Sequence, residues 1–183
     1  MDLSPTAHVI LGMVRWQPRS GYEIKALVDT STRFFWAASY GQIYPELKRL
    51  SEEGLIEGVD EPQGGRRRTR YSITASGREA LEAWLRRPPE VLETRDEGLL
   101  KLFFAGALPR EDAVEIVRAM REQRLALMRR LQQIEPALEQ KDVTFPLFVL
   151  RRGIEMNQWI ADWTERVEKE LLEHDAAKGG TDV

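Results

Sequence analysis

The sequence predicts a mainly α-helical protein with two domains, at residues 1–88 and 97–175, and a flexible tail at 176–183. Two observations carry this prediction. Before residue 55, apolar residues recur at helical spacing in three short segments, and the pattern then changes to two extended segments around a glycine-rich turn. In the second half, apolar residues recur in alternating steps of four and three from residue 113 to residue 138, which is typical of a long packed helix.

The composition favours packed cores and an uneven distribution of charge. Of the 183 residues, 42% are hydrophobic, and the formal net charge is −3, which excludes a generally basic nucleic-acid coat. Residues 1–88 hold 13 lysines and arginines against 11 acidic residues, whereas residues 89–183 hold 14 against 19. A contact with a polyanion is therefore expected in the first half.

The sequence predicts a cytoplasmic protein without a membrane anchor. It contains no cysteine, which excludes disulfides and thiolate chemistry. The first five residues lack a basic leader segment, and no apolar run reaches the length of about 18 residues that would suggest a membrane span.

Two short helices are expected to open the chain. The first covers residues 5–16, where Pro5 suits the first helical turn. A turn at 17–21 leads to the second, at residues 21–31. The aromatic residues at 34–36 then lead into a third helix, and we expect them to pack in a buried corner.

The third helix, expected at residues 40–53, is the element around which the first domain is organised. Ser39 is a favourable N-cap residue and Gly54 a favourable stop. Pro45 removes one backbone hydrogen bond, so an irregular or kinked first turn is expected. The inward stripe of this helix is formed by Ile43, Leu47 and Leu50.

The outward side of the third helix combines Tyr40, Gln42 and Tyr44 with the Lys48-Arg49 pair. This mixture of aromatic, amide and cationic groups is suited to reading a nucleic-acid groove. Taken alone, these residues are equally compatible with an ordinary solvated surface helix.

A two-stranded hairpin is expected after Gly54, with strands at 55–59 and 69–73 and a turn-rich tip at 60–65. Arginines gather at the tip and on the returning strand. Nothing within the isolated hairpin neutralises them, so we favour contact with backbone phosphates over a merely solvated face. These residues are Arg66, Arg67, Arg68 and Arg70.

A helix at 75–87, capped by Thr74 and ended by Pro88-Pro89, completes the first domain. The order helix, helix, helix, strand, strand, helix is that of a winged helix-turn-helix, in which the third helix enters the major groove of double-stranded DNA. The residues expected to contact DNA are Tyr22, Ser39, Tyr40, Gly41, Gln42, Tyr44, Pro45, Lys48, Arg49, Arg66, Arg67, Arg68 and Arg70.

Over residues 8 to 87 the sequence also resembles the PadR-type transcriptional regulators. This resemblance implies a dimeric repressor, usually released by a small molecule. The family usually has serine where Gln42 stands. The segments that carry the resemblance are Gly21-Tyr22-Glu23-Ile24, residues 35–50 with their Ile-Tyr-Pro-x-Leu core, Glu53-Gly54-Leu55-Ile56, and Arg70-Tyr71-Ser72-Ile73-Thr74 followed by Gly77-Arg78-Glu79.

The second half predicts a short helix at 98–105 and two long amphipathic ones. The seam of the first long helix is Ala113, Val117, Met120, Arg124, Leu127, Leu131, Ile134 and Leu138, of which Arg124 alone is polar. The last helix presents Phe148, Ile154, Met156, Trp159, Ile160, Trp163, Val167 and Leu171. Two such helices alone do not bury both stripes, so we expect an antiparallel hairpin that pairs with a second subunit in a homodimer.

Three tryptophans are candidates for binding a small aromatic or hydrophobic effector. Trp159 and Trp163 lie one helical turn apart, and Trp16 ends the first helix. An aromatic pair at this spacing is more often part of a core or an interface. The effector site is suggested by these residues together with the family resemblance.

No catalytic residue, metal ligand set or cofactor is expected. His8 and His174 are the only histidines and stand far apart, and no glycine-rich loop joins a strand to a helix. The main alternative to a DNA-binding regulator is a winged-helix module that binds an acidic protein partner through its arginines. A dimerisation scaffold is a second alternative, and an enzyme is a distant third.

Overall fold

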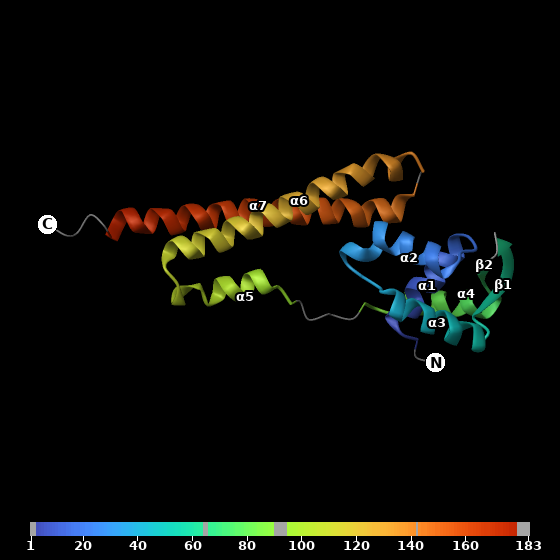
Figure 1. Cartoon of the computed structure of the whole chain (residues 1–183). Coiled ribbons are helices and arrows are strands. Elements are labelled where there is room, and N and C mark those ends of the chain that lie inside the picture. Colours follow the sequence, from blue (N-terminus) through green and yellow to red (C-terminus); the bar gives the residue numbers. More distant parts are fainter. Residues whose placement is uncertain (1–2, 64–65, 90–94, 142, 179–183) are drawn as a thin grey trace. The chain divides into compact units, whose positions relative to one another are not determined.

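The computed structural model describes residues 3–63, 66–89, 95–141 and 143–178, without the side chains of residues 62–63, 66–67 and 174–178. The chain divides into two compact units, residues 1–91 and 92–183. Short helices and a hairpin form the first unit, and helices alone form the second (Figure 1). Both units agree with the predicted fold class. No helix in the described ranges is long and apolar enough to cross a membrane.

The helices of the first unit begin where polar caps are available. α1 (Pro5–Trp16) starts after Ser4, whose hydroxyl accepts from a main-chain N–H in the first turn. α2 (Gly21–Thr30) starts after Ser20, which forms a reciprocal capping box with Glu23. The short 3-10 helix η1 (Thr32–Phe34) leads to α3 (Tyr40–Glu52). The predicted helical segments are therefore confirmed.

The hairpin is longer than predicted. β1 (Ile56–Gln63) pairs antiparallel with β2 (Arg66–Ile73), with Ile56 opposite Ile73. The sequence had placed residues 60–63 in the tip and Arg66 to Arg68 before the returning strand. Pro62 and Gly64 signal a turn, but strand pairing continues past the proline on this two-stranded edge, where a missing N–H is tolerated.

α4 (Ala75–Leu85) follows Thr74, whose hydroxyl accepts from the N–H of Gly77 at 3.1 Å. A Cβ on Gly77 would lie 2.0 Å from the carbonyl oxygen of Leu55, so only glycine permits this close contact between α4 and the start of the hairpin. Leu81 of α4 is buried in the core, whereas Leu85 at the end of the helix is 63% exposed.

One apolar core holds the first unit together. α1 packs against α3, α4 and β2, and α2 packs against α3. All three residues of the predicted α3 stripe are buried in this core. The expected buried corner before α3 is wrong in part, since Phe35 is 58% exposed while Ala38 is buried. The largest fully buried side chains of the unit are those of Ile10, Leu11, Ile24, Val28, Ile43, Leu47, Leu50 and Ile56.

The second unit is a helical hairpin with a short preceding helix. α5 (Glu97–Phe103) and the 3-10 helix η2 (Ala105–Ala107) pack against α6 (Arg110–Glu139). α6 and α7 (Thr144–Lys178) lie side by side over most of their length (Figure 1). The polar residue in the α6 seam has a partner, because the Arg124 guanidinium lies 2.7 Å from the Asp96 carboxylate. α7 continues to Lys178, three residues into the segment expected as a flexible tail, and residues 179–183 lie outside the described residues.

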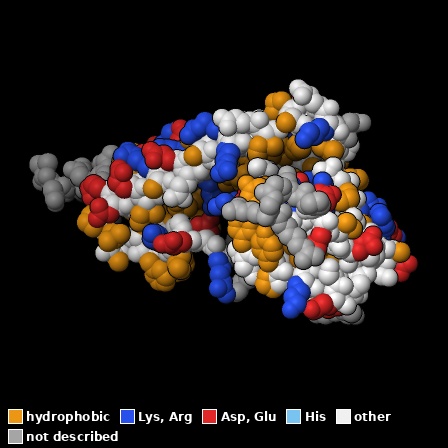
Figure 2. Space-filling model, turned by 45° about the vertical axis from the view of Figure 1, so that its right-hand side comes forward, with side chains coloured by type: hydrophobic (Ala, Val, Ile, Leu, Met, Phe, Trp, Pro, Cys, Tyr) orange, Lys and Arg blue, Asp and Glu red, His pale blue; other side chains and the backbone are white. Residues whose placement is uncertain are grey.

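The predicted face of α7 divides into two. Phe148, Met156 and Trp159, which were expected to share one stripe with Ile154, are 59%, 45% and 60% exposed. Hydrophobic side chains accordingly lie open on the surface of the helical unit in Figure 2. Beside Leu150, the buried positions of α7 include small and polar residues that hydrophobic spacing overlooks, namely Asn157, Ala161, Thr164 and Glu168.

Candidate nucleic-acid interface

The first turn of α3 is held by its own side chains. The Oε1 atom of Gln42 accepts from the main-chain N–H of Ser39 at 2.9 Å and from its hydroxyl at 3.1 Å. The N–H groups of Gln42 and Ile43 share the Ser39 carbonyl as acceptor, and the helix continues through Pro45. Gln42 is exposed, and its amide NH2 group is the part of the side chain suited to donate to DNA.

Two tyrosines of α3 stand on the outer side of the helix and are positioned by α2. Tyr40 is 45% and Tyr44 is 51% exposed, and their rings stack with centroids 6.1 Å apart. The Lys25 ammonium lies 5.4 Å from the centre of the Tyr40 ring. A Cβ on Gly21 would lie only 2.8 Å from the Tyr44 ring, so the glycine makes room for it. Neither Lys25 nor Gly21 is among the residues that were expected to contact DNA.

The adjacent cations Lys48 and Arg49 have different environments. The Lys48 side chain is 78% exposed. The Arg49 guanidinium lies 3.0 Å from Glu46 and 3.8 Å from Glu53, and Glu46 in turn accepts from the Ser4 hydroxyl at 2.8 Å. Lys48 is thus presented to solvent, whereas Arg49 belongs to a network that joins α3 to the start of α1.

The remaining predicted contacts of the helices lie near this face. Tyr22 is 66% exposed in the first turn of α2, which packs on α3. Ser39, Gly41 and Pro45 are exposed in the first half of α3 or just before it. The first turns of α2 and α3 therefore contribute exposed groups to one region of the unit.

The arginines of the hairpin are less available than predicted. The Arg68 guanidinium lies 2.5 Å from the Glu23 carboxylate, and Arg70 donates to a main-chain carbonyl between α1 and α2 at 2.7 Å. The expectation that nothing within the hairpin neutralises these arginines is wrong for Arg70, whose guanidinium lies 4.0 Å from the carboxylate of Glu61 in β1. Arg68 is neutralised from outside the hairpin, by Glu23. The side chains of Arg66 and Arg67 lie outside the described part.

Glu23 is the most strongly perturbed acid of this unit. Its hydrogen bond with Arg68 lowers its pKa from 4.5 to about 2, with further lowering by the hydrogen bonds from Ser20 and opposition from partial burial. Glu23 is therefore ionised throughout the neutral range and holds Arg68 as a charged partner.

The tryptophans proposed for effector binding fall in different units. Trp16 ends α1 in the first unit and is 59% exposed, whereas Trp159 and Trp163 belong to α7 in the second. Trp159 is 60% exposed, while Trp163 is half-buried. Within α7 the two tryptophans are one turn apart, as predicted.

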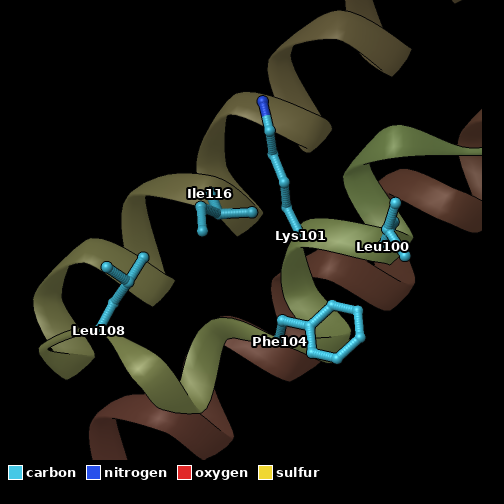
Figure 3. Close-up of a pocket in the computed structure, with 5 residues that line it drawn as sticks. All are labelled: Leu100, Lys101, Phe104, Leu108 and Ile116. Atoms are coloured by element: carbon cyan, nitrogen blue, oxygen red, sulfur yellow. The ribbon is translucent and has the colours of Figure 1, made fainter.

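A shallow apolar depression of about 490 Å³ lies beside α5, in a region to which the sequence analysis assigned no function. Figure 3 shows Leu100 and Phe104 on one side and Leu108 and Ile116 on the other, with the Lys101 amino group directed away from Phe104. The signal in the sequence was the group of apolar residues on both sides of Lys101 at 99–104, which are more than one buried helix face requires.

No catalytic or metal-binding constellation emerges from the described side chains. No group of three or more histidine, cysteine, aspartate or glutamate residues among them could hold a metal ion. The acidic residues near α3 serve as caps and ion-pair partners.

Comparison with known proteins agrees with this geometry. Residues 10–83 match the family described as "Transcriptional regulator PadR-like family", and residues 94–172 match "Virulence activator alpha C-term". The negative transcriptional regulator PadR of Bacillus subtilis is 32% identical over 170 residues, which cover 87% of this chain and 93% of that protein.

Two crystal structures of the Bacillus subtilis protein are similar over most of the chain. The complex of PadR with operator DNA matches with a TM-score of 0.85 at 29% identity, covering 93% of this chain and 99% of that one. The complex with p-coumaric acid matches with a TM-score of 0.76 at 28% identity, covering 93% and 98%. These relatives are regulators rather than enzymes. The chain belongs to the PadR-like family of transcriptional regulators.

Proposed function

We propose that this protein is a homodimeric repressor that acts in the cytoplasm, binds an operator through α3 and its wing, and is released by a small planar aromatic acid. The observation that carries the proposal is the outer face of α3, where Tyr40, Tyr44 and Lys48 stand exposed above a fully buried stripe. Negative regulation and operator binding are named for the Bacillus subtilis relative.

DNA recognition divides between base edges and phosphates. Gln42, Tyr44 and Lys48 are suited to donate to base edges in the major groove, and Tyr40 to pack along the groove wall. The exposed residues at the helix starts bring main-chain N–H groups close to the phosphate backbone, where they fix orientation rather than sequence. Tyr22 and Gly41 can offer main-chain N–H groups in this way. The Ser39 N–H is already bonded to Gln42, so Ser39 offers its hydroxyl, and Pro45, which has no N–H, offers only packing against the DNA backbone.

Dimerisation is assigned to the open face of α7. Phe145 is 80% and Phe148 is 59% exposed, and Trp159 continues the same side of the helix several turns later. Covering such side chains removes apolar area from water, at about 25 cal/mol per Å². A second copy presents the same stripe, so a twofold interface is self-complementary.

The effector is proposed to be a phenolic acid, the chemical class of the compound bound to the Bacillus subtilis relative. Trp159 and Trp163, one turn apart on α7, supply flat apolar surfaces for an aromatic ring. To release DNA, the ligand must bind one state of the dimer more tightly than the other.

DNA binding is tested by titrating the protein with the DNA upstream of its own gene and with a random duplex, at several salt concentrations. Lys48→Ala and Tyr44→Ala should weaken the specific complex by about 1–3 kcal/mol and the random one less. Lys169→Ala is a matched control, because Lys169 is also exposed and also lies within 4 Å of a glutamate one turn away.

Two results would contradict the DNA proposal. One is equal affinity of the wild-type protein for both duplexes, and the other is no loss in either α3 variant while folding and dimerisation persist. The second result would favour the protein-binding alternative. The effector proposal is tested separately, by tryptophan fluorescence and release of DNA on addition of p-coumaric acid. An unchanged signal across a panel of phenolic acids would refute it.

A further inference from the structure

β2 is joined to the corner between α1 and α2 by main-chain and side-chain bonds. Arg19 and Tyr71 form an antiparallel bridge, in which Arg19 N–H donates to Tyr71 O at 3.1 Å and Tyr71 N–H donates to Arg19 O at 2.8 Å. Arg70 donates to the Pro18 carbonyl at 2.7 Å. These bonds place the base of the wing against the helix-turn-helix, but they act close to one point of the strand.

The ion pair between Glu23 and Arg68 adds a second fixed point further along β2 toward the tip. The Glu23 carboxylate is itself immobilised, because it accepts from the Ser20 N–H at 2.8 Å and from the Ser20 hydroxyl at 3.1 Å. Arg68 reaches this carboxylate at 2.5 Å. The bridge and the packing of β2 on α1 hold the base of the strand, and a second fixed point nearer the tip further restrains the angle of the wing.

We propose that Glu23 and Arg68 are positioning residues for DNA binding, which together set the angle of the wing relative to the helix-turn-helix. Arg68 then acts through Glu23 rather than as a phosphate contact of its own. This inference rests on the proposed DNA-binding function, and it separates Arg68 from the neighbouring arginines that the sequence treats as one cationic group.

The availability of Arg68 supports this division of roles. Its side chain is 29% exposed, against 78% for Lys48 on the reading helix. A phosphate would have to displace a carboxylate that already has a close, charge-assisted bond to the guanidinium. Replacing Glu23 by a phosphate as the partner of Arg68 would gain less binding free energy than pairing a phosphate with a free cation. The pair between Glu23 and Arg68 is therefore retained in the DNA complex.

The test uses the full-length protein, three variants and two duplexes. Glu23→Gln removes the negative charge but keeps a side-chain oxygen for the capping box. Arg68→Ala removes the other partner, and the double variant completes a cycle. Affinity for the upstream DNA and for a random duplex is measured between low and moderate salt. Lys48→Ala is the control for a cation that is exposed on the α3 face.

The expected result is the same loss of specific affinity, about tenfold, in both single variants and in the double variant. The salt dependence of binding should stay that of the wild type, because no phosphate contact has been removed. Affinity for the random duplex should fall less. An incorrect wing angle disturbs the alignment of the protein on its specific site more than it reduces the attraction of its charges to any DNA.

Three outcomes would overturn the proposal. The first is a salt slope lowered by about one unit per subunit in Arg68→Ala, together with tighter DNA binding by Glu23→Gln, which would show that Glu23 competes with phosphate for Arg68. The second is additive losses, and the third is no loss in either variant. If the wild-type protein shows no preference for the upstream DNA, the proposed function has failed instead.

A measurement without DNA keeps the inference testable if affinities are hard to determine. Hydrogen exchange of the Arg19 and Tyr71 amides, which form the bridge, should accelerate in Glu23→Gln, while amides of the α1 and α3 cores remain protected. Unchanged exchange at both bridge amides would show that the ion pair does not restrain the wing. A general loss of protection would show that the pair supports the whole unit.

Discussion

The two units of this protein bury different kinds of residue. Among the described residues of the first unit, the core is aliphatic and Ser20 is the single buried polar side chain. The α6–α7 hairpin instead buries Asn157, Thr164 and Glu168 while Phe145 and Phe148 stay exposed. The first unit therefore completes an aliphatic core within one chain, whereas the second leaves large apolar side chains of α7 exposed, at the face where we propose that a second copy binds.

The difference also appears in how charge is used. In the first unit, ion pairs join surface elements, as Glu23 and Arg68 do between α2 and β2. In the second, Glu168 is 9% exposed and receives two arginines of α6, Arg118 at 2.6 Å and Arg121 at 2.5 Å. A buried charge tolerates only the register that supplies its partners, so we infer that this cluster aligns the two long helices.

The largest expected effect comes from charging the open face of α7. Phe148→Glu should convert the dimer to monomer. A twofold interface would bury two unpaired carboxylates, one from each subunit, at a total cost on the order of 6 kcal/mol. Sedimentation or light scattering at micromolar concentration measures the change. Gln158→Glu introduces the same charge at an exposed polar position of α7 and should remain dimeric. A dimeric Phe148→Glu protein would place the interface elsewhere.

The next largest effect comes from opening a cavity in the first unit. Leu47→Ala should destabilise that unit by about 2–5 kcal/mol, because Leu47 is 1% exposed within the aliphatic core. Urea unfolding followed by circular dichroism measures the loss, and the neighbouring exposed residue supplies the control Lys48→Ala. If the cost of Leu47→Ala depends on protein concentration, the first unit also relies on dimerisation, and the comparison between the units no longer holds.

Much of the first unit could be predicted from sequence because local signals agree with the fold. Ser39 signals the start of α3, Gly54 signals its end, and the apolar stripe that begins with Ile43 signals its buried side. In the structure Gly54 has a φ of 68°, which suits a helix stop, and Ile43 is fully buried. The hairpin was predicted too short because Pro62 suggests a turn in sequence, whereas pairing across a two-stranded edge tolerates it.

The errors in prediction have a common physical origin in long-range pairing. Arg68 pairs with Glu23, and Arg70 donates to the Pro18 carbonyl, both about fifty residues earlier in the chain. Likewise, the buried face of α7 includes Asn157 and Glu168, which hydrophobic spacing assigns to solvent. Composition and periodicity report which side chains are apolar, but only the packed structure shows which polar ones have partners inside.

A smaller effect should follow from replacing the buried amide of α7. Asn157 donates to the Gly153 carbonyl at 2.7 Å, while its Oδ1 atom is buried and has no hydrogen-bond partner among the described residues. Asn157→Leu should therefore stabilise the hairpin by about 1–2 kcal/mol, since it removes an unpaired polar atom. Thermal unfolding measures this, with Gln158→Leu at an exposed position as control. A loss of stability would indicate that the second copy supplies the missing donor.

The smallest expected effect is a difference in how strongly acid destabilises the two units. It compares the surface ion pair of Glu23 in the first unit with the buried ion pairs of Glu168 in the second. The pKa of Glu23 falls from 4.5 to about 2, chiefly through its hydrogen bond with Arg68, and that of Glu168 is lowered chiefly by Arg118. A carboxyl with a depressed folded pKa stabilises the protein fully above about pH 4.5, and this contribution is lost as pH falls through the folded value.

Urea unfolding midpoints of wild type, Glu23→Gln and Glu168→Gln at pH 7, 4 and 3 measure these contributions. The stability difference between wild type and each variant should be greatest at pH 7 and shrink toward pH 3, because below about pH 4.5 the carboxyl becomes protonated in the unfolded chain, which favours unfolding of the wild type alone. Glu23 is about one-third exposed, so solvent screening makes its difference the smaller of the two. A larger difference for Glu23→Gln would mean that the wing pairing contributes more to folding than the alignment of the long helices does.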